Sequence, residues 1–274
     1  MTEHTLVRGT VWFRALTGQA SSMPGDSKSV LTADSPLGKE QARFLCVVPD
    51  PNARFPCARH GEIGLEEGYT LAARVREVMQ QDKNKTKRPI VAIVDAKSQA
   101  YGRREETAAI FLACAAAIDA YGSARLAGHP VIALIVGQAI SGVPLTHGYQ
   151  ANRILAFDDG GVVIHAMHKA AAARITRRSL EELEQLAKKI APMSYDIRDY
   201  AKLGLLYKLL HVENPEKPSE QDIRNVQDEL VGAITDARRG SVDLSNRLES
   251  KGALEMRKAS LLVRSRFEAQ WLEN

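Results

Sequence analysis

The amino-acid sequence predicts an α/β fold in which helices connect the strands of a sheet. Short apolar runs of four to six residues, mostly β-branched and bounded by Gly, Pro or Asp, recur along the chain and are typical of buried strands. Amphipathic helical stretches separate these runs, which indicates a sheet covered by helices. The length of 274 residues suits one large domain or two small ones.

The first half of the chain contains a predicted hairpin, a buried strand and two long helices. Leu71, Val75 and Val78 recur at helical spacing and give the first of these helices an apolar face. A long connection over residues 49–64, rich in Pro, Gly and Arg, precedes it. In order, we predict a helical turn at 12–16, hairpin strands at 30–33 and 44–48 around a turn at 34–38, a helix at 65–80, a strand at 90–94 and a helix at 105–121.

The second half adds three short strands and further helices. Ser179 and Glu182 have the spacing of a capping box. A polar, Pro-containing stretch indicates a domain edge, which gives a first domain of residues 1–212 and a helical extension of residues 213–274. We predict this extension as a helical hairpin that either packs on the core or contacts a partner. The other elements are strands at 131–136, 154–157 and 162–165 and helices at 176–190 and 193–210.

A turn rich in small residues follows the strand at 131–136. Small residues let a backbone approach a ligand closely and direct its N–H groups toward it. If a helix begins near Val143, its first-turn amides are unpaired and form a site for developing negative charge. The turn is therefore predicted either as a backbone oxyanion site or as a tight packing turn without chemistry.

Charge and cysteine content favour a soluble cytoplasmic protein. The formal net charge of +4 is too small to indicate nucleic acid and is compatible with an anionic substrate or an acidic partner. Cys46, Cys57 and Cys114 form no CxxC pair, so we expect reduced thiols. The N-terminus lacks the apolar core of a signal peptide, and no apolar run approaches the roughly 20 residues of a membrane helix.

The sequence argues against several common kinds of site, because their motifs are missing. His165 and His168 are three residues apart, but no carboxylate or cysteine completes a metal ligand set at the required spacing. Ser98 lacks the G-x-S-x-G context of a serine hydrolase. Neither GxxxxGK[ST] nor GxGxxG occurs, which argues against a nucleotide site.

Three longer motifs resemble the gamma subunit of bacterial malonate decarboxylase: NARFPCARHGEIGLEEG at 52–68, SQAYGRREE at 98–106 and HGYQANR at 147–153. They occur in the right order, and the resemblance extends over about residues 30–210. This family belongs to the carboxyltransferase branch of the crotonase superfamily. The resemblance therefore implies a spiral of strand-strand-helix units.

The resemblance also implies partners and a reaction. The partners are a beta subunit that shares the active site, an acyl carrier protein subunit and an acyl-carrier transferase subunit. The implied substrate is a malonyl thioester on the phosphopantetheine-type arm of the carrier, and the products are an acetyl thioester and carbon dioxide. Loss of carbon dioxide leaves an enolate, which preorganised backbone N–H groups stabilise. We expect no metal and no cofactor bound directly by this chain.

Two loops of the family are carried over residue by residue. Carboxyltransferases resembling this chain have a Gly-Gly-Ala-Tyr turn that supplies an oxyanion hole, and Ser141-Gly142-Val143-Pro144 takes its place here. Gly142 matches the second glycine, whereas Ser141 and Pro144 depart from the pattern. In the family's Val-Asp-x-Pro-Gly-Phe-x-x-Gly loop, the Pro-Gly-Phe core is missing from residues 94–102, which makes biotin an unlikely cofactor.

The implied site combines catalytic and substrate-binding residues. His147 lies beside the turn in sequence and is a candidate for proton delivery to the carbanion. Arg103 and Arg104 are candidates for binding a carboxylate or phosphate of the carrier arm, or form a solvated loop. Three functions follow: a decarboxylase subunit, a non-catalytic structural partner of the beta subunit, or a carboxyltransferase half that passes carbon dioxide to biotin. The predicted catalytic residues are Gly142, Val143, Gly102 and His147, and the predicted substrate-binding residues are Ser141, Tyr101, Arg103 and Arg104.

Overall fold

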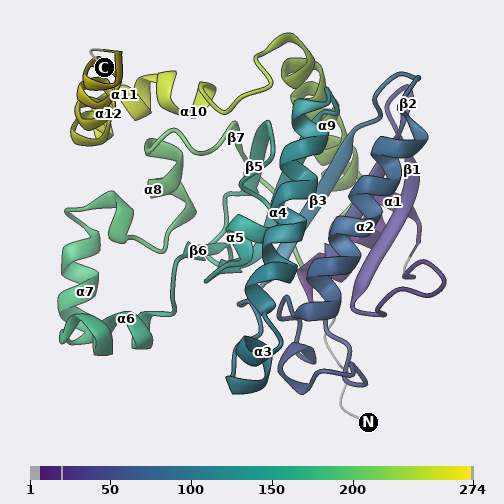
Figure 1. The fold of residues 1–274 in the computed structure, drawn as a ribbon, viewed down its shortest axis with the longest axis horizontal. Coiled ribbons are helices and arrows are strands. Elements are labelled where there is room, and N and C mark those ends of the chain that lie inside the picture. The colour runs from purple at the N-terminus through teal and green to yellow at the C-terminus, as the bar shows by residue number, and fades with distance from the viewer. Residues whose placement is uncertain (1–6, 20, 273–274) are drawn as a thin grey trace.

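The computed structural model describes residues 7–19 and 21–272, which form a mixed sheet with helices on both faces (Figure 1). The strand order is β1-β2-β3-β4-β5-β7, and β6 pairs with β4 outside this path. All neighbouring strands are parallel except β1 and β2. The described strands are β1 (Val30–Leu37), β2 (Glu40–Val47), β3 (Ile90–Ala96), β4 (Val131–Ile140), β5 (Arg153–Phe157), β6 (Val163–His165) and β7 (Lys208–Leu210).

The predicted hairpin is confirmed, but its turn is shorter than predicted. β1 and β2 pair antiparallel from Val30 opposite Val47 to Leu37 opposite Glu40, so residues 34–37 belong to β1. Pro36 is tolerated within a strand because β1 lies at the edge of the sheet. Gly38 makes the tight turn with a φ of 62°, a left-handed conformation that favours glycine.

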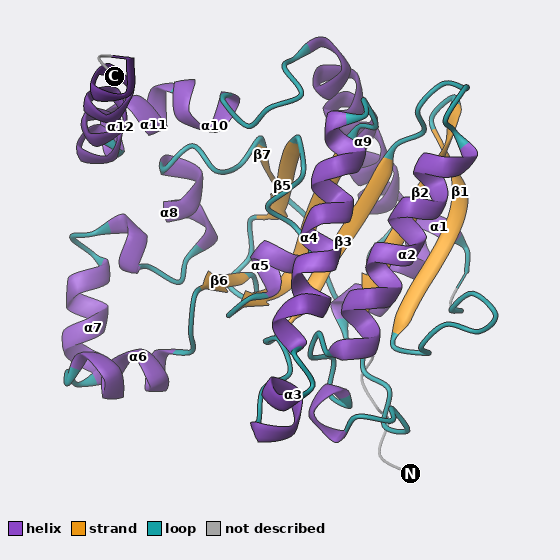
Figure 2. Ribbon diagram, viewed as in Figure 1, coloured by secondary structure: helices purple, strands orange, loops and turns teal. Residues whose placement is uncertain are grey.

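The central strands are confirmed, and β4 is longer than predicted. Its first half pairs with β5, from Ile132 to Ile135, and its second half pairs with β6, from Gln138 to Ile140. The sheet therefore divides along β4, and Figure 2 shows β5 and β6 as separate orange strands. The carboxyl end of β4 projects beyond β5, and the turn after it lies beside β6.

Two helices cover each face of the sheet (Figure 1). α2 (Leu65–Gln81) and α4 (Ile110–Leu126) lie side by side on one face, and α1 (Arg8–Thr17) and α9 (Glu220–Arg239) contact the sheet strands from the other. Trp12 and Phe13 of α1 are fully buried, and the Trp12 ring meets Phe157 edge-on with centroids 4.6 Å apart. This contact confirms that the predicted N-terminal helical turn docks on the core.

Gly68 sets the distance between α2 and α4. A Cβ atom at this position would lie 2.7 Å from the carbonyl oxygen of Ala113. We expect Gly68→Ala to lower the free energy of unfolding by about 1–3 kcal/mol, because backbone atoms cannot move aside easily. Urea denaturation measures this. The control is Gly232→Ala in the exposed face of α9, where a Cβ meets nothing within 4 Å and a gain of about 1 kcal/mol is expected.

The predicted helix at 105–121 is wrong in one respect, because two helices replace it. α3 (Arg103–Thr107) ends before Ala109, which has a φ of 60°, and α4 begins at Ile110. The break turns the chain so that Ile110 and Ala113 join Leu65 and Ala100 in a small buried cluster. Alanine is a strong helix former, so the sequence carries no signal for this break.

The predicted helix at 193–210 is also wrong. Among the described residues of this stretch, a short 3₁₀ turn (Ala191–Met193) is followed by one α-helix, α8 (Ile197–Lys202). The chain then forms the strand β7, which pairs with β5. Gly204 separates the two with a φ of 80°. Upstream, α7 (Leu180–Ala187) has the predicted Ser179 capping box, and α6 (Lys169–Thr176) is an additional helix.

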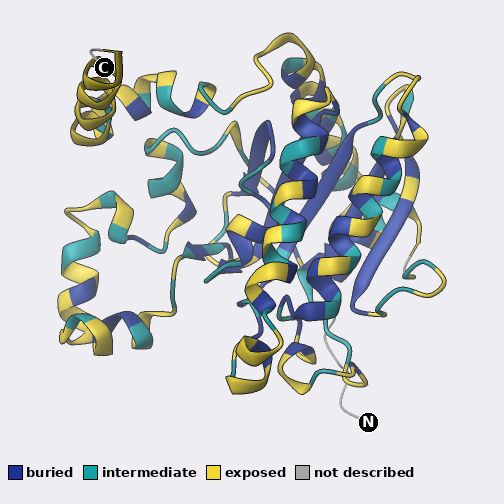
Figure 3. Ribbon diagram, in the orientation of Figure 1, coloured by how far each residue is buried: buried dark blue, intermediate teal, exposed yellow. Residues whose placement is uncertain are grey.

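The C-terminal helices do not form the predicted hairpin. α9 packs on the core and buries Val226, Leu230 and Ile234. The following helices instead lead away from α9 (Figure 1), and α12 buries none of its residues, as its yellow ribbon in Figure 3 shows. Arg247 anchors this part by donating a hydrogen bond to the Tyr149 carbonyl at 2.7 Å. These helices are α10 (Asn246–Glu249), α11 (Lys251–Met256) and α12 (Lys258–Leu272).

Candidate active site

Three segments far apart in the sequence meet beyond the carboxyl ends of β3 and β4. The Ile63 N–H donates to the Ser98 carbonyl at 3.0 Å, and the Ala100 N–H donates to the Ile63 carbonyl at 2.8 Å. Gln99, between these two bonds, accepts a hydrogen bond at its side-chain oxygen from the Gly142 N–H at 2.5 Å. Parallel strands end at the same edge of a sheet, which is where α/β folds place their ligands.

The turn after β4 has the predicted geometry. α5 (Val143–Thr146) begins at the expected residue. Ser141 has a left-handed φ of 64°, and its N–H donates to the His165 carbonyl at 2.8 Å. Gly142 has an ordinary φ of −78°, so its importance lies in close approach: a Cβ would lie 2.7 Å from Gln99 Oε1, and the Gln99 side chain would have to move.

The two predicted oxyanion donors differ in their hydrogen bonding. The Gly142 N–H is occupied by Gln99. In the described part of the chain, no hydrogen bond joins the Val143 N–H to an acceptor outside α5, and Pro144 has no N–H. Val143 is fully buried as a whole residue, so its unpaired amide lies beneath the surface of the turn. The turn therefore offers one unpaired backbone donor beside a paired one.

Gly102, another predicted catalytic position, lies directly before α3 (Arg103–Thr107). A Cβ there would lie 2.7 Å from Glu105 Oε2 and 3.8 Å from Cys57 Sγ. Glu105 is only 2% exposed, although its Oε1 has no hydrogen-bond partner among the described residues. A hydrogen bond to Glu105 raises the pKa of the exposed Cys57 thiol, so the thiol stays protonated at neutral pH. Gly102 thus provides room for a buried carboxyl group.

The predicted substrate-binding residues other than Ser141 flank Gly102 in the chain and are exposed. Tyr101 is 56% exposed, and Arg103 and Arg104 are exposed at the first turn of α3. Neither arginine forms an ion pair within residues 7–19 and 21–272. Both guanidinium groups are therefore available to an anionic ligand.

His147 lies in the core and not at the surface of the turn. It is 1% exposed, its Nδ1 is 2.8 Å from the Tyr121 hydroxyl, and its Nε2 is 3.1 Å from the Ile93 carbonyl. Burial lowers the pKa of His147 to about 4, so the ring is neutral at pH 7. With both nitrogens bonded inside the protein, this geometry favours a structural role over proton delivery.

The buried His147 predicts a pH dependence of stability. Its pKa in the folded protein lies below the ordinary value of 6.5, so the unfolded chain binds the proton more tightly. Stability is therefore full above pH 6.5 and falls by about 3 kcal/mol as the pH approaches 4. Urea denaturation at several pH values should show this loss for wild type and for His60→Gln, whose side chain is 73% exposed. His147→Gln should be less stable at pH 7 and flatter between pH 6.5 and 4; an unchanged slope would contradict the assignment.

Gln99 is the contributor that sequence reasoning missed. Gln99 lies within the motif at residues 98–106, which the sequence shows. Its hydrogen bond with the Gly142 N–H, however, depends on a parallel β-bridge between Ile63 and Gln99. A polar side chain just after a buried parallel strand was the available signal, because neighbouring strand ends converge.

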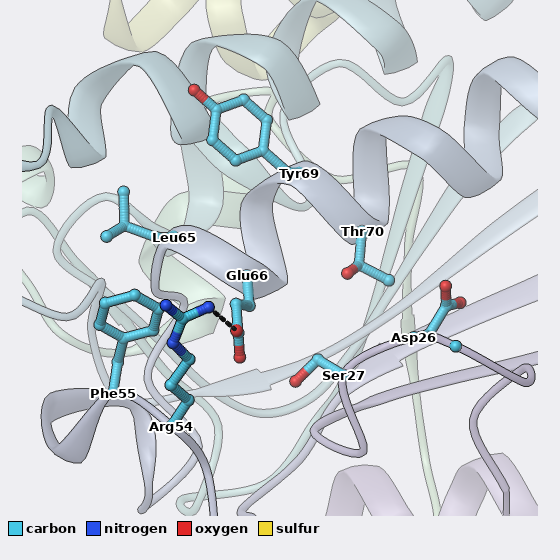
Figure 4. Close-up of a pocket in the computed structure, with 9 residues that line it drawn as sticks. Asp26, Ser27, Arg54, Phe55, Leu65, Glu66, Tyr69 and Thr70 are labelled. Atoms are coloured by element: carbon cyan, nitrogen blue, oxygen red, sulfur yellow. Dashed lines mark ion pairs between the residues drawn. The ribbon is translucent and has the colours of Figure 1, made fainter.

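A cavity of about 410 Å³ lies apart from the turn, at the first turn of α2 (Figure 4). Arg54 pairs with Glu66 at 3.8 Å and lies 5.4 Å from the Phe55 ring centroid. No predicted site residue lines it.

Among the described residues, no group of three His, Cys, Asp or Glu side chains is arranged to hold a metal ion. None of the described helices combines the length and the apolar character that a membrane span needs.

Comparison with known proteins gives consistent matches. In a Pseudomonas malonate decarboxylase hetero-tetramer in complex with coenzyme A, one chain is 52% identical, with a TM-score of 0.92 over 97% of this chain and 100% of that one. The Pseudomonas MdcD-MdcE hetero-dimer matches with the same identity and coverage and a TM-score of 0.89. Transcarboxylase 12S, at 16% identity, 82% of this chain, 41% of that one and a TM-score of 0.61, confirms the crotonase-like fold.

A relative with lower sequence identity is named for a different activity. The malonyl-S-ACP:biotin-protein carboxyltransferase of Malonomonas rubra is 42% identical over 141 residues, which are 50% of this chain and 48% of that protein. The chain thus spans about half the length of this relative. The family model of the malonate decarboxylase gamma subunit matches residues 58–271, most of the chain. The chain therefore belongs to the malonate decarboxylase gamma subunit family.

Proposed function

We propose that this chain acts with a beta-type subunit to decarboxylate a malonyl thioester carried by an acyl carrier protein. The products are the acetyl thioester and carbon dioxide. Family membership and the 52% identity to a chain of the Pseudomonas MdcD-MdcE hetero-dimer support the assembly. The carrier protein and the transferase that loads it are the further partners of this proposal. The carrier's phosphopantetheine-type arm belongs to the substrate, and this chain itself holds no cofactor.

The observation that carries the proposal is the turn from Ser141 to Val143. In the reaction the bond between the carboxylate carbon and the α-carbon breaks, and its electron pair forms the enolate, whose charge lies on the thioester oxygen. The α-carbon then takes up a proton. The Val143 N–H is an unpaired donor beneath this turn, and the Gly142 N–H donates to Gln99 Oε1 at 2.5 Å. Such donors stabilise a developing oxyanion because they need no reorganisation.

Exposed apolar side chains on the elements next to this turn support a site shared between subunits. Tyr101, Phe111, Leu112 and Leu145 form what we call the interface patch, with exposed fractions from 51% to 62%. α4, which carries Phe111 and Leu112, contacts both α3 and α5. Large exposed apolar side chains that cluster beside a candidate site are typical of a surface that a partner covers.

The resemblance to the Malonomonas carboxyltransferase favours a second candidate, transfer of the carboxyl group to biotin. The test is carbon dioxide release by the assembled complex with purified malonyl carrier, with and without an added biotinyl protein. Equal release in both conditions supports decarboxylation. Release that requires the biotinyl protein, together with carboxybiotin formation, would replace our proposal with the second candidate.

A further inference from the structure

The side-chain amide of Gln99 lies against the candidate oxyanion turn. Its oxygen accepts the Gly142 N–H at 2.5 Å, so its amino group points elsewhere. Gln99 is partly exposed, and its Nε2 forms no hydrogen bond with another described residue. Because Nε2 is not a buried atom, it reaches solvent. Gln99 therefore presents two free N–H donors beside the turn.

The backbone holds Gln99 in this position. The hydrogen bonds of Ser98 and Ala100 to Ile63 fix the chain on either side of it. The Gly142 N–H fixes the side chain, and it also identifies which end of the amide is the oxygen. A hydrogen bond accepted at the oxygen of an amide polarises the group and strengthens its N–H as a donor.

We propose that Gln99 is a catalytic residue whose Nε2–H donates to the thioester oxygen of the enolate. This assignment rests on the proposed decarboxylation and deepens it. The Gly142 N–H then acts through Gln99 and not on the substrate directly. Gln99 neither gains nor loses a proton: the electrons of the broken carbon–carbon bond move to the enolate, and the hydrogen bond from Gln99 stabilises the charge on the enolate oxygen.

The test compares Gln99→Glu with wild type in the assembled complex from pH 8 to pH 5. The introduced carboxylate can still accept the Gly142 N–H, but it has no donor, so we expect kcat to fall about 10²–10³-fold at pH 8. On acidification the carboxyl group regains an O–H donor. The ratio of variant to wild-type kcat should therefore rise at least about tenfold by pH 5, since the protonated fraction grows about tenfold per pH unit above its pKa.

Two further variants separate chemistry from structure. Gln99→Leu removes both the donor and the acceptor, and it should lose activity without recovery at low pH. Gln185→Glu places the same charge on the exposed face of α7 and should behave like wild type. Elution of each complex from a sizing column checks assembly.

The outcomes are distinguishable from those of the proposed function. If the wild-type complex releases no carbon dioxide, the proposed function fails, and this assignment fails with it. If wild type is active and Gln99→Glu either stays within about threefold of it at pH 8 or loses activity equally at every pH, only the role of Gln99 is overturned.

Discussion

Gly142→Val is expected to lower decarboxylation by the assembled complex about 10²–10³-fold, the usual cost of losing an oxyanion donor. The Gly142 backbone is ordinary, so a side chain is compatible with its φ, but its Cβ would lie 2.7 Å from the Gln99 oxygen. Valine therefore displaces the Gln99 amide, which moves its N–H donors away from the turn. The measurement is kcat for carbon dioxide release, together with the midpoint of thermal unfolding.

The matched control for this variant is Gly160→Val. Gly160 is exposed, and a Cβ there meets nothing within 4 Å. We expect wild-type kcat from it and nearly equal stability from both variants. Full activity of Gly142→Val in an intact complex would exclude the turn from catalysis and favour the structural-partner function.

Phe111→Glu is expected to weaken assembly with the beta-type subunit by at least about 30-fold in Kd, the effect of losing an interface hot spot of about 2 kcal/mol or more. Phe111 belongs to the interface patch and is 62% exposed, and the substitution buries an unpaired charge on binding. Calorimetric titration of the two purified subunits measures the change.

Phe267→Glu is the control for this prediction. Phe267 lies on α12 and is 66% exposed, so the two phenylalanines are alike in exposure and differ in place. The predicted result is wild-type affinity for Phe267→Glu and weak binding for Phe111→Glu. A larger loss with Phe267→Glu would move the interface from the turn to the C-terminal helix.

The elements with strong periodicity were predictable from the sequence. The apolar runs that became β3, β4 and β5 and the capping boxes of α7 and α9 specify their elements through local chemistry. The start of α5 at Val143 was predictable for the same reason, because Gly and Pro mark the end of a strand and the beginning of a helix.

The errors have a common physical origin in tertiary packing. Ala109 adopts a left-handed conformation, which lets Ile110 enter a buried cluster. An alanine residue does not signal this backbone conformation in the sequence. β7 is a strand because β5 offers it a free edge. Likewise, His147 lies beside the turn in sequence, yet its side chain points into the core, because α5 turns it toward Tyr121.

The most direct test of the central claim is carbon dioxide release from a malonyl thioester carrier by this chain, by a purified beta-type subunit and by their mixture, with no biotin present. We predict release only by the mixture, which would place a biotin-independent site at the interface of the two subunits. The absence of release from a correctly assembled mixture would contradict the account, and the family membership would then specify the fold and the assembly without this reaction.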